Sequence, residues 1–150
     1  MSEKLIIIRG NSGSGKSTVA KIIIIDENNK YLLLKRSEHP RFPNDADLPG
    51  GGVEKDESTL QAVLREVLEE IGVSIDKDLV KKVYEGDEYS AHKTSYCLYI
   101  AQLPKRPQIT ISWEHSSFEW LNRNKFLERA QGAKDTYMHM VYDVLKDRSV

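Results

Sequence analysis

The sequence lacks the features that stabilise proteins outside the cell or anchor them in membranes. It holds one cysteine, Cys97, so no disulfide can form within the chain. No apolar run reaches the roughly 18 residues of a membrane span, and no long signal-type apolar core is present. With 22 Lys and Arg against 23 Asp and Glu, the net charge of −1 argues against broad affinity for nucleic acid. We therefore expect a cytoplasmic protein of 150 residues with small-molecule partners.

The sequence does contain an acidic motif of fixed spacing between residues 51 and 73. Its specified positions are Gly51, Glu57, Arg65, Glu66, Glu69, Glu70 and Gly72. Three carboxylates at positions i, i+3 and i+4 of one helix repel one another unless a cation neutralises them. Carboxylate oxygens suit Mg²⁺ or Mn²⁺, and the phosphate oxygens of a substrate can complete the coordination shell. The motif predicts a divalent-metal site, and the alternative is a solvated acidic face.

The same segment marks the ends of the helix that carries these glutamates. Ser58 and Gln61 have the spacing of a capping box, and Gly72 is a typical C-terminal stop. We expect the helix to run from about residue 58 to 72, with the glutamates toward solvent. The apolar stripe expected to pack inward consists of Leu60, Val63, Leu64, Val67, Leu68 and Ile71.

Residues 51–73 match the pattern G-x5-E-x7-R-E-U-x-E-E-x-G-U, with U apolar, and the chain thereby resembles the Nudix hydrolases. The resemblance runs from about Val19 to the C-terminus and implies an α/β protein, an α/β/α sandwich with a mixed sheet. It assigns metal binding to Gly50, through its carbonyl, and to Glu66, Glu69 and Glu70. It gives structural roles to Gly51, Glu57, Arg65 and Gly72, with Glu57 and Arg65 joining loop to helix. The catalytic base is Glu66, Glu70 or the loop residue Glu114, and the resemblance leaves the choice open.

Short apolar runs between turn-forming residues predict the rest of the fold. We expect strands at 22–25, 31–34, 80–84, 94–102, 109–112 and 118–121, with the first two forming a β-hairpin. Apolar residues at helical spacing predict a last helix over 137–145, on the sheet face opposite the motif helix.

Three residues outside the motif are predicted to bind substrate. Arg36 begins a polar loop, broken by prolines, that leads into the motif and should line the site. Tyr89 lies about where some Nudix members that cleave diadenosine polyphosphates carry a tyrosine that stacks on adenine. His115 is placed to hydrogen-bond a substrate, and the alternative is a merely exposed histidine.

The N-terminus carries a competing signal, because residues 10–17 match G-x4-G-K-[ST] and resemble the phosphate loop of a P-loop kinase. That loop works only between a strand and a helix. Here the four isoleucines at 22–25 predict a strand, which leaves too few residues after the motif for the helix that a phosphate loop needs. We expect an N-terminal arm over 1–18, with a short strand at 5–9, followed by a Nudix domain over 19–150.

The predicted function is metal-dependent hydrolysis of a diphosphate linkage in a nucleoside diphosphate joined to another moiety. Mg²⁺ or Mn²⁺ is the expected cofactor, and a nucleotide diphosphate is the expected partner, without membrane or specific nucleic acid. A homodimer is left open. The alternatives are a catalytically silent Nudix module that binds nucleotides and an ATP-binding P-loop protein.

Overall fold

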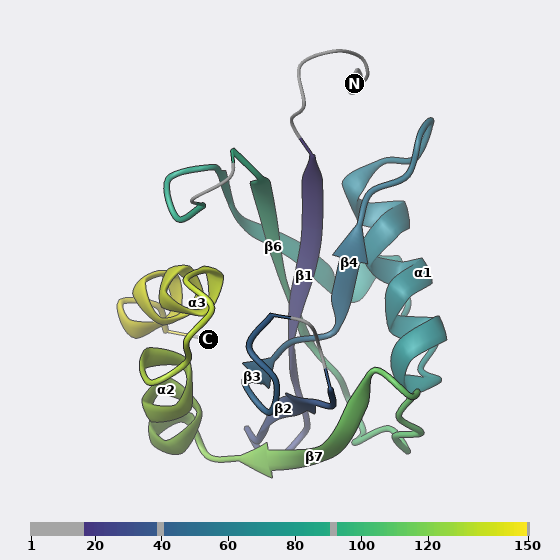
Figure 1. Ribbon diagram of the computed structural model, residues 1–150. Helices are drawn as coiled ribbons and strands as arrows, with labels where there is room; N and C mark the ends of the chain where they lie inside the picture. The colour runs from purple at the N-terminus through teal and green to yellow at the C-terminus, as the bar shows by residue number, and fades with distance from the viewer. Residues whose placement is uncertain (1–16, 39–40, 91–92, 150) are drawn as a thin grey trace.

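The computed structural model describes residues 17–38, 41–90 and 93–149 (Figure 1). Its strands are β1 (Thr18–Ile25), β2 (Tyr31–Arg36), β3 (Ala46–Asp47), β4 (Gly50–Gly52), β5 (Val80–Gly86), β6 (Ser95–Gln102) and β7 (His115–Leu121). Its helices are α1 (Thr59–Ile71), α2 (Arg123–Gln131) and α3 (Tyr137–Lys146), with a short 3-10 turn at Lys77–Leu79. No helix in this described part is long and apolar enough to cross a membrane.

The seven strands form one mixed sheet, as the sequence predicted. The main order is β3-β2-β1-β6-β5, while β4 pairs with β1 and β7 pairs with β2. β1 runs parallel to β6 over its whole length, and the other pairs are antiparallel. The expected hairpin of β1 and β2 is reduced to a single paired position, Ile25 with Tyr31. Beyond it β1 pairs with β4 and β2 pairs with β7, so the sheet opens between them.

The run of isoleucines in β1 explains why helices cover both faces of the sheet. Successive side chains of a strand point to opposite faces. Ile22 and Ile24 pack in the cluster that includes α1, whereas Ile23 and Ile25 pack in the cluster that includes α2 and α3. All four side chains are buried. The α/β/α sandwich predicted from the sequence is confirmed, and Figure 1 shows α1 on one side and α2 with α3 on the other.

The capping predictions for α1 are confirmed. The Ser58 side chain accepts a hydrogen bond from the Gln61 backbone N–H, and the Gln61 side chain accepts one from the Ser58 N–H. Gly72 ends the helix in the left-handed conformation, with φ of 70°.

The predicted faces of α1 need two corrections. Glu70 is only 6% exposed, and Leu68 is 55% exposed. At 3.6 residues per turn, position 70 lies about 20° from position 63, so Glu70 belongs to the inward stripe of Val63 and Val67. Leu68 is rotated well away from that stripe and faces solvent.

Other differences lie in the C-terminal half. Residues 109–112 form no strand, because their backbone bonds instead to the end of α1, through Thr110 N–H to the Ile71 carbonyl and Ser112 N–H to the Glu70 carbonyl. The last strand starts at His115 rather than at residue 118. Helix α2 was not predicted, since only Phe126 and Ala130 of its residues are buried.

The phosphate-loop motif and the predicted strand at 5–9 lie outside the described residues, except for Ser17. The segment that follows is strand β1 from Thr18 onward, so no helix follows the motif. This agrees with the argument that a P-loop fold cannot be built here.

Candidate active site

Two glycines of β4 allow close approach between the sheet and the motif helix. Gly50 has φ of 135°, and a Cβ atom there would lie 2.1 Å from the Ala20 carbonyl oxygen. A Cβ atom on Gly51 would lie 2.7 Å from the Glu66 carboxyl carbon. At Gly50 the clash would be with the backbone of β1, so glycine is needed there for β4 to lie this close, whereas at Gly51 it would be with the movable end of the Glu66 side chain.

Arg65 ties the loop before α1 to the helix, as the sequence spacing predicted. Its guanidinium donates to both carboxylate oxygens of Glu57, at 2.7 and 3.0 Å, and to the Gly52 carbonyl at 3.1 Å. It also reaches Glu66 at 3.1 Å and Glu69 at 3.4 Å. Arg65 therefore has a structural contact on one side and neutralises two motif glutamates on the other.

Glu70 is the buried carboxylate of the motif. Its Oε1 accepts the Gly50 N–H at 3.1 Å. Burial raises the pKa of Glu70 to about 8, and the like charges of Asp47 and Glu66 add to this, while Lys21 opposes it. A carboxylate in this position is costly to ionise without a cation nearby.

Carboxylate and carbonyl oxygens are the ligand atoms that a hard divalent cation prefers, but those of the motif do not converge on one point. Within the described residues no three acidic, histidine or cysteine side chains meet at one point. The Glu66 and Glu69 carboxylates turn toward Arg65, and Glu69 is largely exposed. Cation binding therefore requires both side chains to leave Arg65, which needs only rotation about side-chain bonds.

Beneath β4 lies a buried polar cluster centred on Asp47. The Asp47 carboxylate is contacted by Lys21 Nζ at 3.2 Å, Arg36 Nε at 3.4 Å, His115 Nε2 at 3.0 Å and the Tyr137 hydroxyl. Burial alone would raise the pKa of Asp47, but Lys21, His115 and Arg36 hold it far below its usual range.

Lys21 joins the Asp47 cluster to the motif. Its ammonium group donates to the Leu48 carbonyl at 3.1 Å and to the Gly50 carbonyl at 3.4 Å. Sequence reasoning missed both Lys21 and Asp47. The available signal was a single lysine inside an otherwise apolar strand, since a buried charge of that kind needs a partner.

The structure gives each residue predicted to bind substrate an internal partner. Arg36 is buried between Asp47 and Asp135, with 2.8 Å from Nη2 to Asp135. The Tyr89 hydroxyl donates to Asp143 at 2.6 Å, and its ring meets Tyr84 edge-on. Their roles in substrate binding remain predictions.

His115 is buried rather than exposed, which corrects the alternative raised from the sequence. Its Nε2 pairs with Asp47, and its Nδ1 is buried without a hydrogen-bond partner. Its predicted contact with a substrate is untested.

Glu114 is exposed in the turn just before β7. Its carbonyl accepts the Ser37 N–H at 3.0 Å, and Ser112, two residues earlier, donates its N–H to the Glu70 carbonyl at 2.9 Å. The segment 112–114 thus lies beside the C-terminal half of α1, which carries the motif glutamates.

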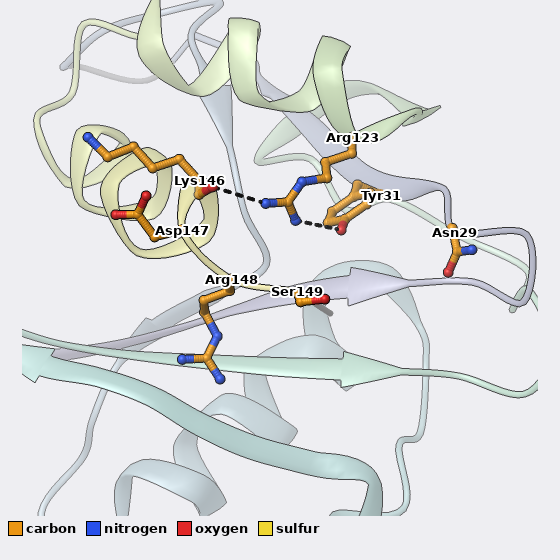
Figure 2. A pocket seen from close by; sticks show the side chains of 7 residues that line it. All are labelled: Asn29, Tyr31, Arg123, Lys146, Asp147, Arg148 and Ser149. Carbon is orange, nitrogen blue, oxygen red and sulfur yellow. Dashed lines mark hydrogen bonds between the residues drawn. The ribbon is translucent and has the colours of Figure 1, made fainter.

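A pocket of about 560 Å³ lies elsewhere, at the end of α3 (Figure 2). It is lined by Asn29, Tyr31, Arg123, Lys146, Asp147, Arg148 and Ser149, none of which belongs to the motif. Figure 2 shows Arg123 reaching the Lys146 carbonyl and the Tyr31 hydroxyl. Arg123 also donates to the Leu145 carbonyl at 2.6 Å, so its positive charge stabilises the C-terminal end of α3.

Among solved structures, the NUDIX domain of Shewanella oneidensis NrtR complexed with ADP ribose is similar, with a TM-score of 0.72 and 20% identity over 91% of this chain and 90% of that one. A MutT/nudix family protein from Enterococcus faecalis has a TM-score of 0.71 and 22% identity over 93% of this chain and 64% of that one. These likenesses support the fold.

Similar sequences match over part of the chain. The 8-oxo-dGTP diphosphatase of Escherichia coli is 37% identical over 59 residues, which are 39% of this chain and 46% of that protein. The ADP-ribose pyrophosphatase of Methanocaldococcus jannaschii is 48% identical over 50 residues, 33% of this chain and 29% of that protein. The matches thus span less than half the length of these relatives. The profile of the NUDIX domain matches residues 15–140, and the chain therefore belongs to the Nudix family.

Proposed function

We propose that the protein hydrolyses a diphosphate linkage in a nucleoside diphosphate joined to another moiety, with Mg²⁺ or Mn²⁺ as cofactor. The observation that carries the proposal is the burial of Glu70 against the Gly50 backbone, with Glu66 and Glu69 on the same helix. Two similar proteins, named as an 8-oxo-dGTP diphosphatase and an ADP-ribose pyrophosphatase, support the substrate class. The single cysteine and the small-molecule substrate favour the cytoplasm.

In this proposal Glu66, Glu69, Glu70 and the Gly50 carbonyl hold the cation. A divalent cation held there would polarise phosphoryl oxygens, lower the pKa of bound water and neutralise the leaving phosphate group. Arg65 Nη1 bridges Glu66 and Glu69 and offsets their mutual repulsion, and the contact of Arg65 with Glu57 holds the loop before α1 against the helix. The proton of the attacking water passes to Glu66, Glu70 or Glu114.

The test is a turnover assay with Mg²⁺ over dinucleoside polyphosphates, nucleotide sugars, ADP-ribose and oxidised deoxynucleoside triphosphates. Glu69→Gln and Glu70→Gln should each lower turnover at least ~100-fold, or about 2.7 kcal/mol, because each removes a charged ligand. Glu85→Gln is the matched control, since Glu85 is exposed on β5, away from the motif, and forms an ion pair with Lys82. Undiminished turnover in excess EDTA would contradict the metal assignment.

A second candidate is a Nudix module that binds a nucleotide without cleaving it. It is favoured by the contacts of Arg65 Nη1 with both Glu66 and Glu69, because a cation of the protein itself then pairs with these carboxylates, and no three acidic side chains of the described residues surround one point. Calorimetric binding of ADP-ribose with no product formed in Mg²⁺ or Mn²⁺ would select this candidate over hydrolysis.

A further inference from the structure

We propose that the indole of Trp113 stacks on the base of the substrate and so makes the site prefer diphosphates that carry a nucleoside. This inference rests on the proposed function and deepens it. Trp113 is 86% exposed, whereas the next most exposed large apolar side chain among the described residues, Leu68, is 55% exposed. Such exposure of a large aromatic surface is unfavourable in the free protein, and a bound ring would cover it.

The backbone under this indole is fixed from two sides. The Trp113 carbonyl accepts the Ser37 hydroxyl at 2.8 Å, and the Ser37 N–H donates to the Glu114 carbonyl at 3.0 Å. On the other side the Ser112 N–H donates to the Glu70 carbonyl at 2.9 Å. The exposed ring is therefore presented by an anchored turn, which limits the ordering cost of binding.

The position of this turn suits a base at the edge of the candidate site. Trp113 lies between Ser112, which bonds to the backbone of Glu70, and Glu114, a candidate catalytic residue. Figure 1 shows the start of β7 beside the lower end of α1. A neutral aromatic face at this edge is suited to hold a base beside a diphosphate that is bound through a cation.

The other large aromatic candidates are already engaged. Arg106 lies over the ring of Trp120 at 4.8 Å, and Trp120 packs against the cluster that includes α1. Tyr89, the residue predicted from the sequence to stack on adenine, is tied to Asp143 and meets Tyr84 edge-on. No ring or cation of the described residues is found stacked on Trp113.

The kinetic test compares a substrate that carries a base with one that lacks it. ADP-ribose and 5-phosphoribosyl 1-diphosphate are the two probes, and Trp113→Ala and Trp113→Phe are the variants. Trp113→Ala should raise KM for ADP-ribose roughly five- to 100-fold with kcat changed less than about twofold, since stacking contributes mainly to binding. Trp113→Phe should recover most of the loss. The same KM rise with the base-free probe, or none with either, would overturn the inference.

A binding test separates this inference from the proposed hydrolysis. The chain has two tryptophans, so Trp120→Phe leaves Trp113 as the only indole. Titrating ADP in the presence of Mg²⁺ should quench its emission in a saturable way, whereas ribose 5-phosphate with Mg²⁺ should not. Trp113→Phe, which leaves Trp120, is the control and should show no such quenching.

The two tests have distinguishable failures. If Trp120→Phe does not fold, the difference between wild-type and Trp113→Phe emission supplies the same readout. Quenching by ADP in a protein that cleaves no compound of the panel would retain the stacking and reject the hydrolysis. Hydrolysis of ADP-ribose without quenching would reject the stacking and retain the hydrolysis.

A blue shift of Trp113 emission that grows with protein concentration and blocks quenching would show that a second copy covers the ring, and would also reject the stacking.

Discussion

At the scale of single residues, Asp47 links the stability of the protein to its candidate site. It lies between the cations of Lys21 and Arg36 on a buried face, and it also accepts from Tyr137 and pairs with His115. Buried charges are tolerated when each has a partner. Removing this one carboxylate leaves Arg36 with Asp135 alone and takes away the carboxylate that pairs with the buried Lys21, which also contacts the Gly50 carbonyl.

We therefore expect Asp47→Asn to lower the free energy of unfolding by about 3–5 kcal/mol at neutral pH. Because the pKa of Asp47 is lowered in the folded protein, its contribution is present above the unfolded value of about 4 and is lost as pH falls below it. The difference between wild type and Asp47→Asn in urea unfolding should be constant from about pH 8 to 5 and shrink below about pH 4.

Asp147→Asn serves as the control, because Asp147 is exposed at the end of α3, and it should change the unfolding free energy by less than about 0.5 kcal/mol. A difference between wild type and Asp47→Asn that grows on acidification would contradict the charge network.

Contacts between residues that are close in sequence were predictable, whereas contacts between residues that only the folded sheet brings together were not. Glu57 and Arg65 belong to one motif of fixed spacing, whose resemblance to the Nudix pattern implied a contact between loop and helix, and the two side chains are hydrogen-bonded. Lys21 and Asp47 lie 26 residues apart, on β1 and β3, which are not paired with each other. Only the folded sheet brings them together, so no local pattern could indicate the Asp47 cluster.

At the scale of elements, local signals set the ends of α1 but not all of its faces. The capping box and the C-terminal glycine act within a few residues, and both were predicted. Which side chains are buried depends on where β4 lies, and Glu70 faces it. Helix α2 escaped prediction because its own sequence is polar and its two buried residues gain their contacts from the sheet and α3.

The contact of β4 with β1 gives a test at this scale. Gly50→Ala would place a Cβ atom 2.1 Å from the Ala20 carbonyl oxygen, at a φ of 135°. We expect a loss of at least about 2 kcal/mol in the free energy of unfolding, measured with urea, because the backbone cannot yield without breaking the pairing.

Gly52 in the same strand provides the matched control. A Cβ atom there meets nothing within 4 Å, so Gly52→Ala should stay within about 0.5 kcal/mol of wild type. Equal stability of the two variants would show that β4 does not approach β1 as closely as described.

At the scale of the whole molecule, the core and the candidate site share side chains. A chain of contacts runs from Tyr137 on α3 through Asp47 and Lys21 to Gly50 and Glu70, and so crosses the sheet from one helical layer to the other. The overall sandwich was predictable because the Nudix resemblance implied it and the apolar spacing at 137–145 predicted a helix on the sheet face opposite the motif helix. The polar contacts that cross the sheet were not predictable, since they depend on β1, β3 and β4 coming together between the two helical layers.

The start of β1 directly after the phosphate-loop motif gives a prediction about that motif. Directly after Lys16 the backbone is already engaged with the sheet, because Ser95 N–H donates to the Ser17 carbonyl at 2.9 Å and Thr18 pairs with Ser95. A phosphate loop needs the N-terminus of a helix at this point. We therefore expect Lys16→Ala to leave kcat/KM for diphosphate hydrolysis within about twofold of wild type, because no helix follows the motif to complete a phosphate site.

Lys21→Ala is the informative comparison, because it removes a lysine only five positions later that is buried against Asp47 and Gly50. It should lower the free energy of unfolding by about 3 kcal/mol or more, since it leaves the Asp47 carboxylate one cation short. Both variants are compared in urea unfolding, in turnover and in ATP binding by calorimetry. A folded Lys16→Ala protein that loses ATP binding together with hydrolysis would mean that the N-terminal arm takes part in the reaction, and the division at residue 18 between arm and Nudix domain would then be wrong.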